Sequence, residues 1–319
     1  MACNRAPHVS FILPAYKRRF LAETVASVFA QTYRDFELVV VDDGSPEGLE
    51  EVLGSFSDPR LRYLRYEDNL GGRDLTAAWN RAFAEARGRL AVLASDDDRY
   101  HPEYLAEMVA LAERFPDVDV FHCRVAYIDA EGRTHGESEL RAEHESAVRF
   151  LHSRGVRHLG QCAPDFTFRT EALRACGGFV PMPRAWYSDD ATWMMLARRG
   201  GVAYSPRTLF EWRWSGVNVS AGFLDVAEKL EAGERFREWV HGYLETLTPE
   251  TPEDKALLAA MPRGLDSMID AMSFWVLRHA PPRVGWRAVS RLRRRWPERI
   301  EFLSRIVCTA LRRRLSRMV

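Results

Sequence analysis

The chain has 319 residues, of which 46% are apolar and 28% are charged, with 45 basic and 45 acidic side chains. This composition excludes a disulfide-stabilised mini-protein, a collagen-like chain and a wholly disordered protein. The five cysteines are scattered without a CxxC pair, and no apolar run approaches the roughly 18 residues of a membrane-spanning helix. We therefore expect a soluble, cytoplasmic protein with a large α/β domain and an appendage, or two ordinary domains.

Strand and helix patterns alternate over the first 120 residues. The run Leu38–Val41 is continuously apolar, which indicates a strand buried on both faces. Strands separated by helices of this length are typical of βαβ units and a mostly parallel sheet. The predicted strands lie at 9–13, 38–41, 61–64, 90–94 and 118–121, and the predicted helices at 21–30, 75–86 and 102–115.

The pattern changes further along the chain. The periodicity fades between about 128 and 165, which predicts loops over the sheet. The remaining predicted elements are a helix at 188–199, short strands at 202–204 and 209–214, and helices at 223–246, 253–279 and 284–317. We therefore expect an α/β domain at 1–220 and a helical C-terminal extension at 221–319.

Two acidic clusters directly follow predicted parallel strands. Asp42 and Asp43 follow one strand, and Asp96, Asp97 and Asp98 follow another. Ligands of open α/β sheets bind at the carboxyl ends of the strands, so both clusters are expected at one crevice. A divalent cation shared with substrate phosphates would offset their repulsion. Helix capping is the alternative, but it leaves two of the three later acids unexplained.

Two further polar segments are candidates for the same crevice. The pair Asp189 and Asp190 lies at a predicted helix start, where it either caps the helix or supplies a general base. Arg73 follows Gly71 and Gly72 in a loop that leads into a helix. Its guanidinium and the nearby backbone N–H groups could meet a pyrophosphate, although an ordinary loop arginine would look the same.

The segment VSFILPAYKRRFLAETVASVFAQTYRDFELVVVDDGSPEG resembles the opening of family 2 glycosyltransferases, which have the GT-A fold. NLGGRDLTAAWNRAF, GRLAVLASDDDRYHPEYL, FTFRTEALRACGGF and YSDDATWMMLARRGG then follow in that family's order. The resemblance covers about residues 9–220. The chain is also similar to enzymes proposed to build spore-coat polysaccharide. It implies a three-layer α/β/α domain that transfers a sugar with inversion from a uridine or thymidine diphosphate donor. The acceptor would be a hydroxyl of a glycan or a lipid-linked acceptor, in polysaccharide or glycoconjugate biosynthesis.

The same resemblance implies a nucleotide-binding role for five residues. Asp43 would accept a hydrogen bond from the base, and Tyr16 would lie against the ring. Pro14 and Ala15 would line this pocket through their backbone, and Arg73 would lie near the base or the diphosphate.

It also implies roles for the other acids. Asp97 matches the acid that holds Mn²⁺ or Mg²⁺, Asp96 the acid near the ribose, and Asp98 the family's frequent third acid. The DxD motif could instead be Asp96 and Asp98. Asp190 matches the catalytic base, and Asp189 would orient it or touch the sugar.

One segment departs from the family pattern. Relatives often have Y-R-x-H after the last strand, whereas this chain has EWRWS at 211–215. No histidine stands at the matching place, so we do not expect a third protein ligand to the metal from this segment.

The C-terminal end is strongly basic. Residues 283–319 hold twelve arginines and two glutamates, a net charge of +10. Residues 299–317 have the pattern of a basic amphipathic helix. Such a helix either lies on an anionic membrane surface, at the inner face of the membrane, or packs on the catalytic domain or a dimer partner. No recognised nucleic-acid motif accompanies the arginines, so no nucleic-acid partner is expected. The oligomeric state is not predicted.

Two other functional classes are alternatives at this point. A nucleotidyltransferase that makes the nucleotide sugar usually has a Gly-rich basic loop after its first strand, and LPAYKRR has no glycine run. A non-catalytic nucleotide-sugar-binding protein would not require Asp43, Asp97 and Asp190 together.

Overall fold

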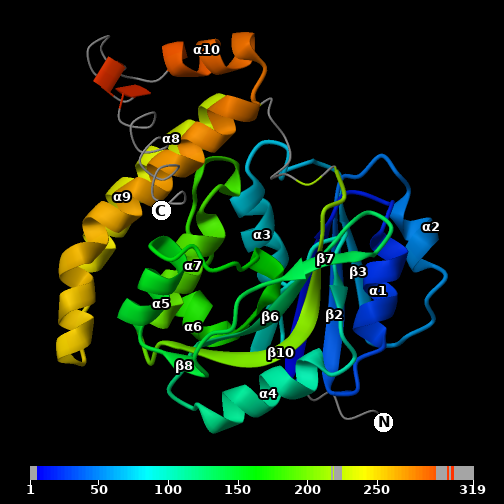
Figure 1. Cartoon of the computed structure of the whole chain (residues 1–319). Helices are drawn as coiled ribbons and strands as arrows, with labels where there is room; N and C mark the ends of the chain where they lie inside the picture. Colours follow the sequence, from blue (N-terminus) through cyan, green and yellow to red (C-terminus); the bar gives the residue numbers. More distant parts are fainter. Residues whose placement is uncertain (1–5, 217, 219–224, 292–299, 302, 305–319) are drawn as a thin grey trace.

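A ten-stranded sheet forms the centre of the computed structural model, which describes residues 6–216, 218, 225–291, 300–301 and 303–304 (Figure 1). The strands are β1 (Val9–Ala15), β2 (Phe36–Asp43), β3 (Leu61–Tyr66), β4 (Leu90–Leu93), β5 (Arg99–Tyr100), β6 (Val120–Ile128), β7 (Thr134–Glu137), β8 (His144–Glu145), β9 (Phe166–Arg169) and β10 (Val202–Arg213). The helices are α1 (Leu21–Phe29), α2 (Leu49–Leu53), α3 (Leu75–Phe83), α4 (Tyr104–Arg114), α5 (Ala147–Gly155), α6 (Thr170–Ala175), α7 (Ser188–Ala197), α8 (Val226–Glu245), α9 (Pro252–His279) and α10 (Pro282–Arg291). Two 3₁₀ turns lie at Ala163–Asp165 and Pro183–Ala185.

The sheet is parallel in one half and mixed in the other. Its order is β3-β2-β1-β4-β9-β6-β10-β5, with β7 beside β6 and β8 beside β10. β3, β2, β1 and β4 run parallel, whereas β9 is antiparallel to both β4 and β6. The carboxyl ends of β1, β2 and β4 therefore open on the same edge of the sheet, as the sequence predicts.

Helices cover both faces of the sheet and give three layers. Along β1, Ile12 faces a core shared with α3, α5, α6 and α7, whereas Phe11 and Leu13 face a core shared with α1, α2 and α4. All eight residues of β2 are buried, which confirms the prediction that this strand is covered on both faces. Burial of alternating apolar side chains on both faces is the main favourable term that holds such layers together.

The C-terminal helices lie against the layer that contains α5 and α7. α8 and α9 pack against each other, and they contact α7 and α5 respectively (Figure 1). Phe236 and Val240 of α8 and Leu265 of α9 belong to the same buried core as that layer. Among the described residues, no helix is both long enough and apolar enough to span a membrane.

Several segments differ from the sequence-based expectations, which contain no element at α2, β5, β9 or α6. The region 128–165, expected as loops, contains β7, β8 and the helix α5, whose N-cap Ser146 accepts a hydrogen bond from the Arg149 amide. The two strands expected at 202–204 and 209–214 form one strand, β10, with register shifts between Ser205 and Phe210. In the predicted helix 284–317, α10 ends at residue 291, and most of the remainder lies outside the described residues.

Candidate active site

Asp43 ends β2 and holds the loop that leads into α3. Its Oδ2 accepts a hydrogen bond from the Gly71 amide at 2.6 Å, and its Oδ1 pairs with the Arg81 guanidinium. A Cβ on Gly71 would lie 2.9 Å from this Oδ2, so a larger residue at this position would force the Asp43 carboxylate to shift. The guanidinium of Arg81 also lies 4.0 Å above the ring of Tyr66. Asp43 is thus fixed at the carboxyl edge of the sheet.

The arginine beside Asp43 is not the one that the sequence singles out. Arg73 has a side chain that is 71% exposed and pairs with Asp68 at 3.1 Å. Arg81, from the last turn of α3, supplies the cation at Asp43 instead. Arg81 is not recognisable from the sequence, because only the helical spacing of 75–83 brings it back to the end of β2.

The neighbouring Asp42 has a structural partner set. It accepts hydrogen bonds from the Ser45 amide at 2.7 Å and from the Tyr63 hydroxyl at 2.6 Å, and it pairs with Arg65 at 2.7 Å. Its carboxylate is fully buried on the side of β3. Asp42 therefore fixes the turn that follows β2, and it does not cap the next helix, α2, whose N-cap residue is Gly48.

The segment that follows β1 is held by Asp96. Pro14 and Ala15 end the strand, and the amides of Tyr16 and Lys17 donate to Asp96 Oδ2 at 2.9 and 2.7 Å. The Tyr16 carbonyl accepts from a serine hydroxyl of the β2 turn, and its side chain is 37% exposed. Tyr16 therefore lies on the surface between the two acidic clusters, with its backbone fixed on both sides.

The three consecutive aspartates face different partners. Asp97 Oδ2 accepts from the Ser215 hydroxyl at 2.9 Å and from Asn218 at 3.2 Å, and it lies 3.6 Å from Lys17 Nζ. Asp98 turns inward, where the Ser95 hydroxyl and the amide that ends β10 donate to it. Ser215 is the last residue of the EWRWS segment, where the family resemblance leads us to expect a histidine.

Charge in this cluster is only partly compensated. Burial raises the pKa of Asp96 and, still more, that of Asp98, and the neighbouring Asp97 charge adds to both effects. Lys17 Nζ lies 3.5 Å from Asp96 Oδ1. Burial would lower the pKa of Lys17, but the surrounding carboxylates outweigh burial and leave it raised. One ammonium thus faces three carboxylates.

The donor set fits a cation shared with a substrate rather than a closed protein site. Among the described residues, no group of three or more His, Cys, Asp or Glu side chains is arranged to hold a metal ion. The carboxylates of Asp96 and Asp98 accept backbone amides, whereas the described partners of the Asp97 carboxylate all bind its Oδ2. One or two carboxylates completed by phosphate oxygens and water is a usual arrangement for Mg²⁺.

Asp189 and Asp190 lie in the first turn of α7. The residue before the helix, Tyr187, has a φ of 70° and makes no side-chain capping bond. Arg154 of α5 donates two hydrogen bonds to Asp190, from Nε to Oδ1 at 2.6 Å and from Nη2 to Oδ2 at 3.1 Å. Gln161 Nε2 also donates to Oδ1 at 3.1 Å. Asp190 is therefore an ionic partner in a buried network, not a helix cap.

The segments after β1, β2 and β4 and the start of α7 are joined by contacts. The Thr76 hydroxyl of α3 lies 2.9 Å from that of Ser188, the first residue of α7. Burial raises the pKa of the Cys162 thiol, and the charges of Asp98 and Asp189 add to this shift. Cys162 thus lies within electrostatic range of Asp98 and of Asp189. The proposed roles of the individual residues in this region remain predictions.

Asp189 gives a pH-dependent stability prediction. Burial, followed by the charge of Asp190, raises its pKa from 3.8 to about 7. The folded protein therefore keeps this proton at a pH where the unfolded chain has lost it, so the contribution of Asp189 to stability falls as pH rises from about 4 to 7. We expect Asp189→Asn to raise the melting temperature relative to the wild type by several degrees more at pH 8 than at pH 5. An equal difference at both pH values in scanning calorimetry would contradict the raised pKa.

Comparisons with known proteins identify the family. The family model described as "Glycosyl transferase family 2" matches residues 10–177, which is more than half of the chain. The chain belongs to glycosyl transferase family 2. The match contains Asp43 and the 96–98 aspartates and ends before Asp189.

Several family 2 relatives and solved structures resemble the chain. TuaG of Bacillus subtilis (strain 168), a glycosyltransferase that its name assigns to teichuronic acid biosynthesis, is 26% identical over 71% of this chain and 86% of its own length. The crystal structure of S. aureus TarS 1-349 with UDP-GlcNAc aligns with a TM-score of 0.62 at 17% identity, over 95% of this chain and 89% of that one. The mannosyltransferase PcManGT of Pyrobaculum calidifontis, with GDP-Man and Mn²⁺, gives 0.57 at 16% identity, over 97% and 81%. These likenesses support the GT-A fold predicted for this family 2 chain.

Proposed function

We propose that this family 2 protein is an inverting glycosyltransferase that moves a sugar from a nucleoside diphosphate to an acceptor hydroxyl. The observation that carries the proposal is the pair Asp189 and Asp190 in the first turn of α7, of which the buried Asp190 is held by Arg154. The charges of Asp189 and of Asp98, in the other acidic cluster, both act on the Cys162 thiol. A uridine or thymidine diphosphate donor is favoured. The solved structures with UDP-GlcNAc and GDP-Man support a nucleotide-sugar donor of this general kind.

The donor would bind across the carboxyl ends of β1, β2 and β4. Asp43 accepts from the nucleotide base, and Tyr16, exposed between the two acidic clusters, stacks on its ring. Pro14 and Ala15 line the pocket, Asp96 lies toward the ribose, and Arg73 or Arg81 lies near the base or diphosphate. Arg81 already touches Asp43, so it is the better supported of the two arginines.

In the proposed reaction the acceptor oxygen forms a bond to the anomeric carbon while the bond from that carbon to the diphosphate oxygen breaks. The bonding electrons leave with the diphosphate, and the hydroxyl proton passes to the Asp190 carboxylate. A single displacement of this kind inverts the anomeric centre, through an oxocarbenium-like transition state. Asp97, with Asp98 or Asp96 nearby, would hold Mn²⁺ or Mg²⁺, which supplies Lewis-acid stabilisation of the leaving diphosphate.

The nature of the released product tests this function. The purified protein is incubated with UDP-GlcNAc, GDP-Man or a thymidine diphosphate sugar and Mn²⁺, with and without a glycan acceptor extract. We expect release of the nucleoside diphosphate, faster with acceptor and from one donor class above the others. Release of pyrophosphate from a nucleoside triphosphate and a sugar phosphate would instead favour a nucleotidyltransferase. Binding of a donor without any turnover would favour a non-catalytic protein.

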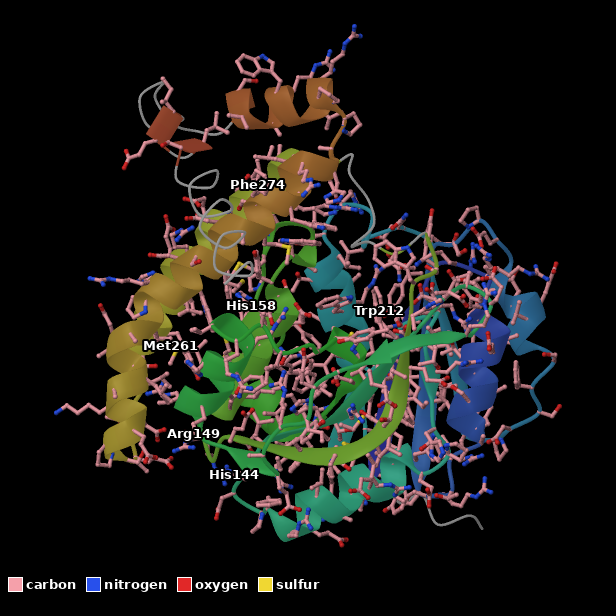
Figure 2. The ribbon with its side chains drawn as sticks, viewed as in Figure 1. His144, Arg149, His158, Trp212, Met261 and Phe274 are labelled. Carbon is pink, nitrogen blue, oxygen red and sulfur yellow. The ribbon has the colours of Figure 1, made fainter. Side chains whose placement is uncertain are left out.

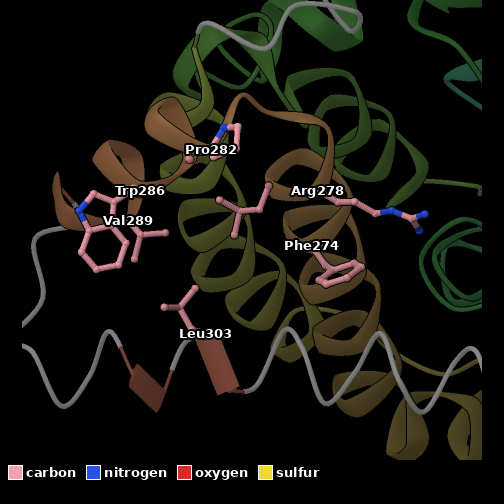
Figure 3. Close-up of a pocket in the computed structure, with 8 residues that line it drawn as sticks. Phe274, Arg278, Pro282, Trp286, Val289 and Leu303 are labelled. Atoms are coloured by element: carbon pink, nitrogen blue, oxygen red, sulfur yellow. The ribbon is translucent and has the colours of Figure 1, made fainter.

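We further propose that the C-terminal end meets an anionic membrane surface at the inner face, where a lipid-linked acceptor would lie. An apolar pocket of about 410 Å³ lies between α9, α10 and Leu303 (Figure 3). It is lined by Phe274, Leu277, Arg278, Pro282, Gly285, Trp286, Val289 and Leu303. Trp286 is 64% exposed, and Arg283 and Arg287 flank it on α10. An exposed tryptophan beside arginines is the composition of an interfacial membrane helix.

Vesicle binding tests the membrane contact. Each basic residue near an anionic surface contributes on the order of 1 kcal/mol, so the double variant Arg283→Gln and Arg287→Gln should bind such vesicles at least about 10-fold more weakly. Sedimentation with phosphatidylglycerol vesicles measures this, with neutral phosphatidylcholine vesicles and deletion of 283–319 as the two reference points. Donor hydrolysis in solution should be unchanged in the double variant. If the protein that lacks 283–319 binds phosphatidylglycerol vesicles as well as the full-length protein does, the membrane contact is contradicted. The basic end would then pack on the catalytic domain or a dimer partner.

A further inference from the structure

We infer that Arg154 and Gln161 are positioning residues that select Oδ2 of Asp190 as the atom that receives the acceptor's proton. The inference rests on the proposed function, in which Asp190 is the base. A carboxylate has about four acceptor sites, two on each oxygen. Arg154 Nε and Gln161 Nε2 occupy Oδ1, at 2.6 and 3.1 Å, whereas Oδ2 accepts only from Arg154 Nη2 among the described residues.

The hydrogen bonds from Arg154 and Gln161 also fix the direction in which Asp190 Oδ2 points. Asp190 is 3% exposed, and a bidentate guanidinium–carboxylate pair sets both the position and the plane of the carboxylate. Gln161 is itself held, since Arg141 donates to its Oε1 at 3.4 Å. The amide therefore presents its NH₂ group to Asp190. A hydroxyl that approaches the pair finds one acceptor site, on Oδ2.

The C-terminal helices buttress this arrangement. Arg154 lies one residue before the end of α5, where Gly155 meets α9 so closely that a Cβ would lie 2.3 Å from Leu265 Cδ2. On the other side, Tyr187 at the start of α7 stacks on Phe236 of α8 with ring centroids 4.6 Å apart. The C-terminal helices α8 and α9 thus pack against α7, which carries Asp190, and α5, which carries Arg154. This gives α8 and α9 a role in positioning the base.

The charges of Arg154, Asp189 and Asp190 make the ionisation of Asp189 depend on Arg154. Burial opposes the positive charge of Arg154, but the carboxylates of Asp190 and Asp189 outweigh it and keep the pKa of Arg154 raised. Arg154 in turn lowers the pKa of Asp189, which burial and Asp190 raise to about 7. The other charged or titratable groups that interact with these residues come from several elements. They are Tyr187 before α7, Cys162 and Asp165 of the segment after α5, Arg141, Tyr127 of β6 and, through Tyr187, Arg237 of α8. Removal of Arg154 should therefore make Asp189 hold its proton to a higher pH.

Two variants and a matched control test the inference. Arg154→Met should keep UDP affinity within about twofold by calorimetry, while donor turnover falls about 10–100-fold, the cost of a misplaced reacting group. The loss should be larger at pH 6.5 than at pH 8.5. Arg154→Lys keeps the charge but not the two-pronged geometry, so it should restore the pH profile and leave the rate low. Gln161→Leu should lower turnover without moving the profile.

The control lies on the same helix. Arg149 of α5 is labelled in Figure 2. It pairs with Glu253 and Asp254 of α9, at 2.7 and 3.3 Å, and these ion pairs do not involve Asp190. Arg149→Met loosens the same α5–α9 contact and should turn over donor near the wild-type rate. If Arg149→Met is as slow as Arg154→Met, or if Arg154→Met matches the wild type in rate and profile, the inference is wrong.

The experiment also separates this inference from the proposed function. An Asp190→Asn variant that transfers sugar normally would contradict Asp190 as the base. A slow Asp190→Asn together with a normal Arg154→Met would contradict only the positioning role. If Arg154→Met does not fold, Gln161→Leu, which removes no charge, decides the matter: normal turnover overturns the inference and reduced turnover supports it.

Discussion

Asp190→Asn is expected to bind the donor within about twofold of the wild type and to transfer sugar at least ~10²-fold more slowly. Asparagine has nearly the shape of aspartate, but its amide cannot take the proton of the attacking hydroxyl. Asp190 contacts Arg154 and Gln161 rather than the residues proposed to bind the nucleotide, so donor affinity should be little affected. Single-turnover transfer and UDP calorimetry on the same preparation measure the two effects separately.

Asp189→Asn is the matched control for this prediction. It removes the neighbouring carboxylate without changing the hydrogen bonds that Arg154 and Gln161 make to Asp190. If Asp190 is the base, the Asp189 variant should retain clearly more transfer than the Asp190 variant. The reverse order would move the proton-accepting role to Asp189, whose raised pKa of about 7 would suit a base at neutral pH. Near-normal transfer by both variants would remove this pair from the chemistry.

The sequence predicts the part of the fold in which local pattern and burial agree. The apolar run in β2 is buried along its whole length, and the acids that follow β2 and β4 lie at one edge because these strands are parallel neighbours of β1. A parallel strand covered on both faces leaves a continuous apolar signal, and its end is marked by the first polar residues. The positions of Asp43 and the three later aspartates therefore follow from the pattern alone.

The helix α5 is not predictable in the same way. Its residues AVRFLHSRG mix polar and apolar side chains, and the helix is surrounded by polar segments. Its buried face is covered by α9, more than a hundred residues later, and this partner is not visible in the local pattern. Tertiary packing rather than propensity therefore stabilises the element that carries Arg154.

The partners of the acids are also hidden from sequence reasoning. Arg81 pairs with Asp43 across 38 residues, Arg154 with Asp190 across 36, and Ser215 with Asp97 across 118. Arginine is common throughout this chain, so its occurrence at one position carries little information. Only the folded arrangement distinguishes Arg81, which touches Asp43, from Arg73, which is exposed and pairs with Asp68.

Asp97→Ala is expected to abolish the stimulation of donor binding and turnover by Mn²⁺. Among the described residues, the contacts of the Asp97 carboxylate all fall on one oxygen, Oδ2, whereas Asp96 is committed to the amides after β1 and Asp98 to that of Arg213. Loss of groups that merely orient a metal ligand usually costs 10–100-fold in metal affinity, so loss of the ligand itself should cost at least about 10-fold. Calorimetric titration of UDP with and without Mn²⁺ measures the effect directly.

Ser215→Ala is the graded control, because it removes one of the groups that orient Asp97 and leaves the carboxylate in place. Its Mn²⁺ response should lie between those of the wild type and Asp97→Ala. Lys17 lies 3.5 Å from Asp96 and 3.6 Å from Asp97. Asp97→Ala therefore also tests whether the Lys17 ammonium alone can hold the diphosphate. Unchanged Mn²⁺ stimulation in Asp97→Ala would move the ligand to Asp96 or Asp98. Strong UDP binding that is insensitive to Mn²⁺ in the wild type would instead make Lys17 the cation of this site.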